Sequence, residues 1–347
     1  MALAFARMLC IGAALCGATS CNSALVHGLA TAFEDAPDPA PWNYLPLADY
    51  SFSPPPGSEL SLLDIYAPAF VIEEGEAEWN RIGTPTLARG VWCERARVDP
   101  ARPALYAEAR TERVGSQEVY ELLYRVHFEQ FAPSWTTLFS LHRNAGLLVI
   151  VTLDRATLVP LLVSTVHTCG CWLAVQPTAA LAPEALPADW PAQELVLAGE
   201  HLAARLPVPG KGQRLVVFLR SRSHRVHDVR VGEPGLASPL VLPLRDMREL
   251  RRLAIAGTDG ETGSFFYERG YLRGYVRGAW APLEGLTLGL LTFDPRLGMD
   301  RDFGDPAETG ARFFTALAPW KRESSRLDRF GCALGELGFR LDAFGPE

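Results

Sequence analysis

The stretch of sequence that decides the fold is Leu161-Leu-Val-Ser-Thr-Val-His-Thr-Cys-Gly-Cys-Trp-Leu-Ala-Val-Gln-Pro177. It begins with apolar and β-branched residues typical of a buried strand. It then holds the chain's one cluster of chemically unusual side chains, His167, Cys169 and Cys171. Successive side chains of an extended strand point to opposite faces, so these three are expected on one face. The stretch therefore predicts a β fold that carries an imidazole and two thiols side by side.

An imidazole and two thiols are ligands that soft metal ions prefer. Zinc takes four such ligands, whereas copper(I) takes two or three. The three donors would supply most of a coordination shell. His127 on an earlier predicted strand is the natural fourth ligand, with Glu129 beside it as a substitute. This interpretation predicts a zinc or copper site.

Two other interpretations of the same residues stay open. In the first, Cys169 and Cys171 form a disulfide across Gly170. Extended residues two apart place their Cα atoms roughly 6.6 Å apart, which is close to the disulfide limit of about 7 Å. In the second, both thiols are inert parts of a packed core. The sequence does not decide between metal, disulfide and core.

Composition argues against several classes of function. The chain has 347 residues, of which 48% are apolar and 21% charged, the balance of an ordinary globular protein. Its net charge is -7 and its basic residues are scattered, so the sequence predicts no nucleic-acid partner. The sequence also lacks a Gly-x-Ser-x-Gly elbow and a Gly-rich phosphate loop. No reaction is assigned, and whether the protein is an enzyme stays open.

Periodicity predicts a mainly β domain around this stretch. Residues 118–131 alternate between an apolar face and a polar face that carries His127, which indicates a strand. Residues 147–154 and 158–166 are nearly continuous apolar runs separated by a turn. We expect them to form an antiparallel hairpin buried on both sides. A further strand is expected over 214–231.

Helical spacing is confined to the late part of the chain. Met247, Leu250 and Leu253 predict a helix over 244–256. The predicted fold class is mainly β, an antiparallel β-sandwich-like domain with a helical C-terminal region. Residues 177–209, rich in Pro and Ala, are expected to be irregular. The predicted organisation is a signal peptide (1–20), a Pro- and Ala-rich tether (21–57), the mainly β domain (58–305) and the helical region (306–347).

The first residues are a targeting segment. Arg7 precedes an apolar stretch that is too short to span a bilayer, and small residues then lead to Cys21. This arrangement resembles the lipobox of bacterial lipoproteins, although Ala18 stands where that family usually has Leu. The resemblance implies that Cys21 carries lipid and anchors the protein to the outer membrane, facing the periplasm. Ordinary signal-peptide cleavage near the same place is the alternative.

The remaining cysteines are candidates for a disulfide, because the cell envelope is oxidising. If Cys169 and Cys171 bind metal or each other, Cys93 and Cys332 remain, and these two are predicted to pair. The membrane, through the lipid, is the one predicted partner, and the sequence names no protein partner.

Three further polar groups have ordinary interpretations. His224 and His227 lie three apart on an expected strand and so face opposite ways, which favours a solvated basic turn over a chelate. Asp300 and Asp302 lie in an acidic segment without the Gly and Glu positions of an EF-hand, which favours a solvated turn over a calcium site. His142 is expected to be a hydrogen-bonded loop histidine.

Two resemblances to known families bear on these predictions. The order of parts resembles bacterial lipoproteins that carry the same His-Thr-Cys-Gly-Cys stretch, and this transfers no activity. Tyr66-Ala-Pro-Ala-Phe, His142 before a buried strand, and Ser223-His224 after another are similar to vacuolar-sorting-type β proteins. In that family the loop histidine precedes Asp-Trp-Glu, whereas Ala145-Gly-Leu stands here. This similarity implies a β fold and nothing more.

Overall fold

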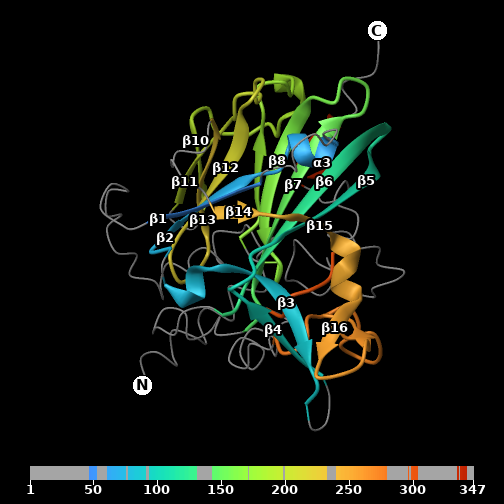
Figure 1. The fold of residues 1–347 in the computed structure, drawn as a ribbon. Helices are drawn as coiled ribbons and strands as arrows, with labels where there is room; N and C mark the ends of the chain where they lie inside the picture. The colour runs from blue at the N-terminus through green and yellow to red at the C-terminus, as the bar shows by residue number, and fades with distance from the viewer. Residues whose placement is uncertain are drawn as a thin grey trace, which may run out of the picture.

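The computed structural model describes residues 47–52, 61–75, 77–90, 94–130, 143–170, 172–197, 200–232, 240–279, 296, 298–303, 334–335 and 337–341. Within these residues the protein is mainly β, as predicted. Its strands form a ten-stranded, a five-stranded and a two-stranded sheet (Figure 1).

The five-stranded sheet has the order β13-β12-β2-β1-β14. The neighbours β2 and β12 run parallel, and so do β1 and β14. β12 and β13 form an antiparallel hairpin with a bulge between Phe218 and Leu219. The strands are β1 (Leu47–Phe52), β2 (Ala69–Glu73), β12 (Arg214–Leu219), β13 (Val226–Gly232) and β14 (Leu240–Leu242).

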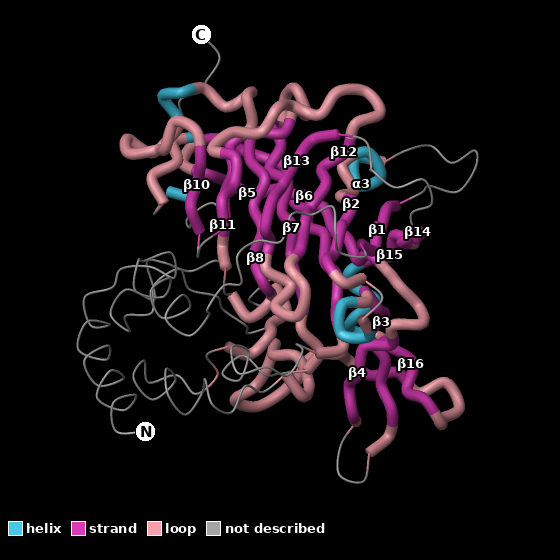
Figure 2. The backbone as a smooth tube through the Cα atoms, turned by 90° about the vertical axis from the view of Figure 1, so that its left-hand side faces the viewer, coloured by secondary structure: helices cyan, strands magenta, loops and turns pink. Residues whose placement is uncertain are grey.

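The ten-stranded sheet is built on the antiparallel run β6-β7-β8-β9, which contains the predicted hairpin. At its far end, β3, β4 and β16 extend away from the five-stranded sheet (Figures 1 and 2). Its strands are β3 (Ile82–Ala88), β4 (Arg95–Asp99), β5 (Leu105–Val114), β6 (Gln117–Phe128), β7 (Gly146–Asp154), β8 (Pro160–His167), β9 (Ala174–Pro177), β15 (Leu244–Asp246), β16 (Leu253–Ala256) and β17 (Thr262–Gly263).

Connections on both sides hold the two large sheets together. Residues 240–246 pass from one sheet to the other, because β14 pairs with β1 while β15, just after Pro243, pairs with β5. On the opposite side (Figure 2), the hairpin of β10 (Glu194–Leu197) and β11 (Glu200–Ala203) contacts both sheets. Gln176 Nε2 of β9 donates to Ala203 O at 2.9 Å, and His227 Nδ1 of β13 donates to Glu200 Oε2 at 2.5 Å.

The large sheet is buried on both faces. One face packs against the five-stranded sheet around Phe70, Val217, Tyr124 and Val149. The other face packs beneath the segment 247–279, with Leu123, Leu148 and Phe265 in its core. Every residue of β8 is buried, which explains why its sequence is a continuous apolar run rather than an alternation.

Several predictions about individual segments were wrong. The predicted helix over 244–256 is instead β15, a short 3-10 helix η4 (Met247–Arg251) and β16. The predicted continuous strand over 214–231 turns back on itself as the β12–β13 hairpin. The expected irregular segment 177–209 contains the β10–β11 hairpin. Residues 47–52 of the predicted tether form β1, so the folded domain begins before residue 58.

The predicted helical C-terminal region, 306–347, is not confirmed. Of this region only 334–335 and 337–341 lie within the described residues. These pack on the large sheet: Leu334 and Leu341 are fully buried, and the ring of Phe339 lies 5.3 Å from that of Trp190. Helices are few elsewhere in the described chain: α3 (Leu62–Ile65), η2 (Glu78–Asn80), η3 (Pro183–Ala185) and η4.

The helices of the described residues are short. None of the helices there has the length and apolar character to span a bilayer.

One carboxyl group lies inside this two-sided core. Glu121 of β6 is fully buried, and Arg110 Nε donates to its Oε2 at 2.9 Å. Burial raises the pKa of Glu121, the charge of Arg110 opposes the rise and Glu112 adds to it, so that the pKa is about 7.

This raised pKa predicts how stability depends on pH. In the unfolded chain Glu121 ionises near pH 4.5, whereas the folded protein holds the proton up to about pH 7. The folded state therefore binds more protons between these values, and the contribution of Glu121 to stability falls as pH rises through this window. Urea unfolding at several pH values should show a flatter pH dependence for Glu121→Gln than for wild type. Glu118→Gln on the same strand, whose side chain is 38% exposed, should keep the wild-type dependence. An unchanged slope in Glu121→Gln would contradict the assignment.

Candidate functional site

The sequence-predicted site lies where three loops meet at one end of the two large sheets. The first loop joins β8 to β9 and contains His167 and Cys169, the second joins β12 to β13, and the third joins β2 to η2. His167 Nε2 lies 2.9 Å from His224 O, and His224 Nε2 lies 2.9 Å from Trp79 O. These contacts link the three loops in series.

The β8–β9 loop does not continue the strand. β8 ends at His167, and Gly170 N donates to His167 O at 2.7 Å, which closes a turn. Gly170 has a φ of 95° and Trp172 a φ of 59°, both in the left-handed region. The expectation that His167 and Cys169 share one face of an extended strand is therefore wrong, because the strand ends at His167; Cys171 lies outside the described residues.

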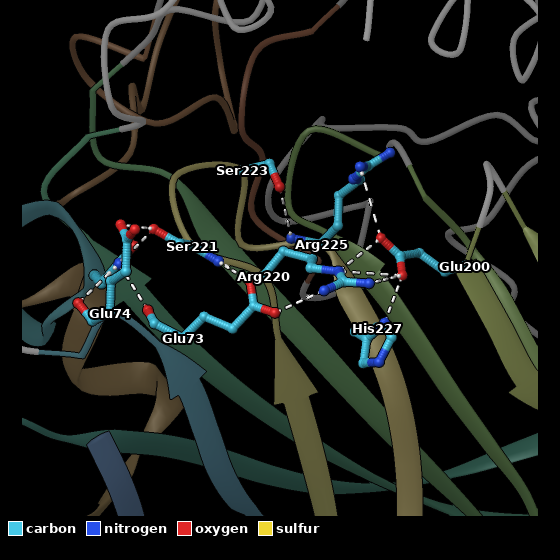
Figure 3. Close-up of polar contacts among 9 residues, drawn as sticks. Glu73, Glu74, Glu200, Arg220, Ser221, Ser223, Arg225 and His227 are labelled. Atoms are coloured by element: carbon cyan, nitrogen blue, oxygen red, sulfur yellow. Dashed lines mark hydrogen bonds and ion pairs between the residues drawn. The ribbon is translucent and has the colours of Figure 1, made fainter. Parts of the chain in front are cut away.

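A charge network lies beside this loop, centred on the guanidinium of Arg220 (Figure 3). Arg220 Nη1 donates to Glu73 Oε1 at 2.7 Å, and Arg220 Nη2 donates to Glu200 Oε2 at 3.0 Å. His227 Nδ1 donates to the same Glu200 oxygen at 2.5 Å, and Arg225 Nη2 lies 3.6 Å from Glu200 Oε1. Four elements contribute: the end of β2, the start of β11, the end of β12 and β13.

The network sets the charge state of Glu200. Burial alone would raise the pKa of this carboxyl group, but hydrogen bonds from His227 and Arg220 and the charges of Arg220 and Arg225 outweigh burial. The pKa of Glu200 is lowered to about 2. Glu200 therefore stays ionised under all ordinary conditions, as a fixed anion rather than a group that exchanges protons.

Asn80 joins the charge network to the backbone of the loops. The buried side chain donates from Nδ2 to Glu73 O at 2.8 Å and to Ser221 Oγ at 3.0 Å, and its Oδ1 accepts from Arg222 N at 3.0 Å. Ser221 Oγ in turn donates to Glu74 Oε2 at 2.6 Å. The β12–β13 turn is thereby tied to the end of β2.

Strained backbone accumulates at this end of the molecule. Glu74, Trp172, Arg222 and His224 all have positive φ angles, between 48° and 67°, although none is glycine. Each such conformation costs of order 1–3 kcal/mol and persists only where the surrounding contacts impose it. Strain of this kind clusters at functional sites, which makes this loop cluster the candidate site of the chain.

His127 lies on the other face of the large sheet from His167. In the ladder His127 pairs with Gly146, whereas His167 pairs with the next residue, Leu147, and neighbouring residues of a strand point to opposite faces. The His127 ring packs edge-on against Phe265 and Tyr106 at centroid distances of 5.1 and 6.0 Å. The structure therefore does not bring the predicted fourth ligand, His127, to His167. Glu129, the substitute, follows the end of β6.

The environment of His127 suits a neutral packing residue. Burial, with a further contribution from the charge of Arg125, holds the pKa of His127 well below its usual range. Within the part of the chain that the structure describes, neither ring nitrogen has a hydrogen-bond partner.

The thiols are only partly placed. Cys169 is buried in the β8–β9 turn, with 7% of its surface exposed. Cys21, Cys93, Cys171 and Cys332 lie outside the described residues, as does His142. Among the described residues, no group of three or more His, Cys, Asp or Glu side chains is arranged to hold a metal ion. The metal, disulfide and lipid assignments that depend on these cysteines stay predictions.

The acidic segment near residue 300 is a buried strap, and the solvated turn predicted for it is wrong. Asp300 is fully buried and accepts from Gly146 N at 3.3 Å and from the Thr168 hydroxyl. Asp302 is 6% exposed and forms an ion pair with Arg251 at 3.0 Å. Asp300 therefore holds residues 298–303 against the end of the sheet, and Asp302 ties them to η4.

His224 and His227 do not share a site, as their spacing predicted, but they are not a solvated turn. His224 is 1% exposed and stacks on Phe128, while His227 belongs to the charge network. Sequence reasoning missed Glu73 and Arg220. Their signal is a charged residue at the end of each of two apolar runs: Glu73 is the last residue of β2, and Arg220 directly follows β12. The two strands are parallel neighbours.

Comparison with known proteins adds no family to this description. Searches against protein-family models, curated protein sequences and solved structures found no match to the chain.

Removal of Arg220 should destabilise the protein strongly. Arg220→Met would leave Glu73 and Glu200 without their shared partner, and breaking a buried ion pair in this way costs about 3–5 kcal/mol. Arg230→Met is the matched control, because Arg230 pairs with Asp228 but its side chain is 61% exposed. Exposed pairs contribute about 1 kcal/mol or less. Urea unfolding at neutral pH measures both, and equal losses in the two variants would refute the central role of Arg220.

Proposed function

We propose that the protein is a lipid-anchored cell-envelope protein whose β domain carries a soft-metal or thiol site at His167, Cys169 and Cys171. In this proposal Cys21 is acylated, the chain is attached to the outer membrane, and the domain faces the periplasm. Zinc and copper(I) are the ions that this donor chemistry suits.

The observation that carries the proposal is the hydrogen bond from His167 Nε2 to His224 O at 2.9 Å. A carbonyl oxygen only accepts, so Nε2 carries a proton in this contact. Metal-binding histidines are commonly oriented by such a bond from the other ring nitrogen to a carbonyl. Cys169 lies in the same turn, which the hydrogen bond from Gly170 N to His167 O closes, and in this proposal it supplies the soft donor.

The second candidate is a non-catalytic envelope protein that binds a partner or structures the surface, with Cys93–Cys332 as a disulfide that staples the β core. The charge network favours it. Glu73, Glu200, Arg220 and His227 are all committed to one another, which is the arrangement of a rigid scaffold rather than of a reacting centre.

Metal analysis separates the two candidates. Protein purified without chelator should contain about one equivalent of zinc or copper per chain. Cys169→Ser/Cys171→Ser should lose it, because a serine hydroxyl is a poor ligand for a soft ion. Cys93→Ser is the matched control and should keep the metal. Equal metal content in the double variant and wild type would refute the metal site. Peptide mapping without reductant would then show whether the two thiols are bonded to each other.

The anchor is tested separately by fractionation. Wild-type protein should partition with membranes and detergent, because each buried CH₂ of an acyl chain adds about 0.8 kcal/mol. Cys21→Ser should be soluble or remain as uncleaved precursor, whereas Cys16→Ser should still partition with membranes. Wild-type protein found free, with an N-terminus beyond residue 21, would overturn the anchor without affecting the metal test.

A further inference from the structure

Residues 267–278 carry one short pattern in three consecutive copies: Tyr-Glu-Arg-Gly, Tyr-Leu-Arg-Gly and Tyr-Val-Arg-Gly. The glycines that end the copies, Gly270, Gly274 and Gly278, have φ angles between 75° and 80°, in the left-handed region that glycine favours. Each copy therefore ends in a turn. The segment lies at the end of the large sheet where β3, β4 and β16 are found (Figure 1), and it has no part in the proposed thiol site.

The two ends of this segment form the base of a hairpin. Tyr267 N donates to Tyr275 O at 2.8 Å, and Gly274 N donates to Tyr267 O at 2.7 Å. Tyr275 and Val276 are buried, and Val276 N donates to Asp300 O at 2.8 Å. The base is therefore fixed on the body of the protein.

The tip of the hairpin, residues 268–273, faces solvent. Every residue of the tip is exposed except Leu272, which is half-buried. A Cβ placed on Gly270 would meet no other atom within 4 Å, so the space around this turn is open. Tyr271 is 61% exposed, more than any other large apolar side chain of the described residues. The hairpin tip is therefore a protrusion and not a groove.

The exposed ring of Tyr271 is held from behind. The guanidinium carbon of Arg296 lies 4.5 Å from the centre of this ring, and Arg296 Nη1 donates to Tyr271 O at 3.4 Å. The same guanidinium lies 5.4 Å from the ring of Tyr275 in the buried base. Because Tyr271 is already ordered by these contacts, it loses little conformational entropy when it meets a partner.

The hairpin tip is basic although the chain as a whole is acidic. Residues 267–278 contain three arginines and one carboxylate, whereas the net charge of the chain is -7. Arg269, two residues before Tyr271, is exposed and forms no ion pair with any described residue. The most exposed aromatic ring of the described chain therefore lies beside an uncompensated positive charge.

Two more exposed arginines lie near the base of the hairpin. Arg277 Nη1 donates to Glu94 Oε2 at 3.0 Å, just before β4 begins. Arg95 and Arg97 of β4 are exposed, and as alternate residues of a strand they point to the same side. Neither forms an ion pair within the part of the chain that the structure describes. This end of the large sheet thus presents a positive surface around the protruding tyrosine.

A protruding tyrosine among arginines suits the surface of an anionic membrane. Tyrosine favours the boundary between lipid and water, because its ring is apolar while its hydroxyl stays hydrated. Arginines are attracted to the phosphates of anionic lipids. A protein partner would require about 800 Å² of contact from some 20–30 residues on each side, which is more than residues 268–273 offer.

We propose that the hairpin tip docks on the anionic phospholipid surface of the membrane that carries the anchor. This inference rests on the proposed lipid at Cys21, which holds the chain close to the surface, so that a weak contact is enough for docking. Docking of Tyr271 and Arg269 would fix how the β domain is oriented on the membrane.

Vesicle sedimentation tests this docking in the absence of the lipid. Every protein in the test is the full chain with Cys21→Ser, so that any contribution of the N-terminal segment is the same in each. The chain with an intact tip should bind phosphatidylglycerol vesicles and should bind phosphatidylcholine vesicles at least about tenfold more weakly. Binding to the anionic vesicles should fall as salt is added, because salt screens the attraction.

Two substitutions in the tip should weaken this binding. Arg269→Gln should lower the affinity for anionic vesicles about fivefold, the contribution of one arginine near a charged surface. Tyr271→Ser should lower it to a similar extent, because the apolar area that enters the interface is lost. Both positions are exposed, so both variants should stay folded, and circular dichroism checks this.

Matched controls make the same changes away from the hairpin. Arg230 of β13 has a side chain that is 61% exposed, and Val196 of β10 is 58% exposed. Arg230→Gln and Val196→Ser should leave vesicle binding unchanged. Equal binding to both kinds of vesicle, or unaltered binding by both tip variants, would overturn the docking.

Fractionation of wild type and Cys21→Ser tests the anchor independently. If wild type proves to have no lipid but the tip variants lose vesicle binding, the anchor fails and the docking surface stands. If wild type is anchored but the chain with Cys21→Ser binds no anionic vesicles, the docking alone fails.

Discussion

Burial of the ten-stranded sheet on both faces is the constraint on which the rest of the structure depends. In its central strands β6, β7 and β8, every residue is buried except three of the first four residues of β6 and the last residue of β7, which are half-buried. A sheet covered on both sides cannot send polar groups to solvent along its length, so polar chemistry is displaced to the strand ends. The loop cluster around His167 and His224 lies at one of those ends.

Where ionisable groups do enter this core, they contact polar groups of neighbouring elements. Glu121 is matched by Arg110 on the adjacent strand, and residues 298–303 are held down by Asp300, Asp302 and the carbonyl of Arg301, which accepts from Arg125 at 2.8 Å. The same rule governs the five-stranded sheet. Leu219 of β12 pairs with Ile72 of β2, so the residues that follow, Arg220 and Glu73, meet at the sheet end. Register thus places a salt bridge where two apolar strands stop.

Alternation and apolar runs predicted the central strands, because both patterns follow directly from which faces are buried. The pattern of residues 118–131 and the hairpin of β7 and β8 were read correctly for this reason. The prediction of a helix over 244–256 was wrong. Met247 and Leu250 fit one turn of either helix type, and after them Leu253 and Ile255 alternate with exposed alanines as a strand. A three-residue apolar spacing is too short to tell a 3-10 turn from a continuing helix.

The predicted metal site shows the limit of sequence reasoning most clearly. The sequence shows that His127 and His167 lie on strands, but a shift of one residue in register moves a side chain to the opposite face. The observed ladder puts Gly146 opposite His127 and Leu147 opposite His167, which separates the two imidazoles by the full sheet.

The two imidazoles consequently have different capacities. His127 is enclosed by aromatic rings and held neutral by burial, so it can only pack. His167 ends its strand and donates to the carbonyl of His224, whose ring contacts Phe128 of β6 and the carbonyl of Trp79 in η2. Identical side chains on adjacent rows of one sheet therefore differ in chemistry because one lies within the two-sided core and the other at its edge.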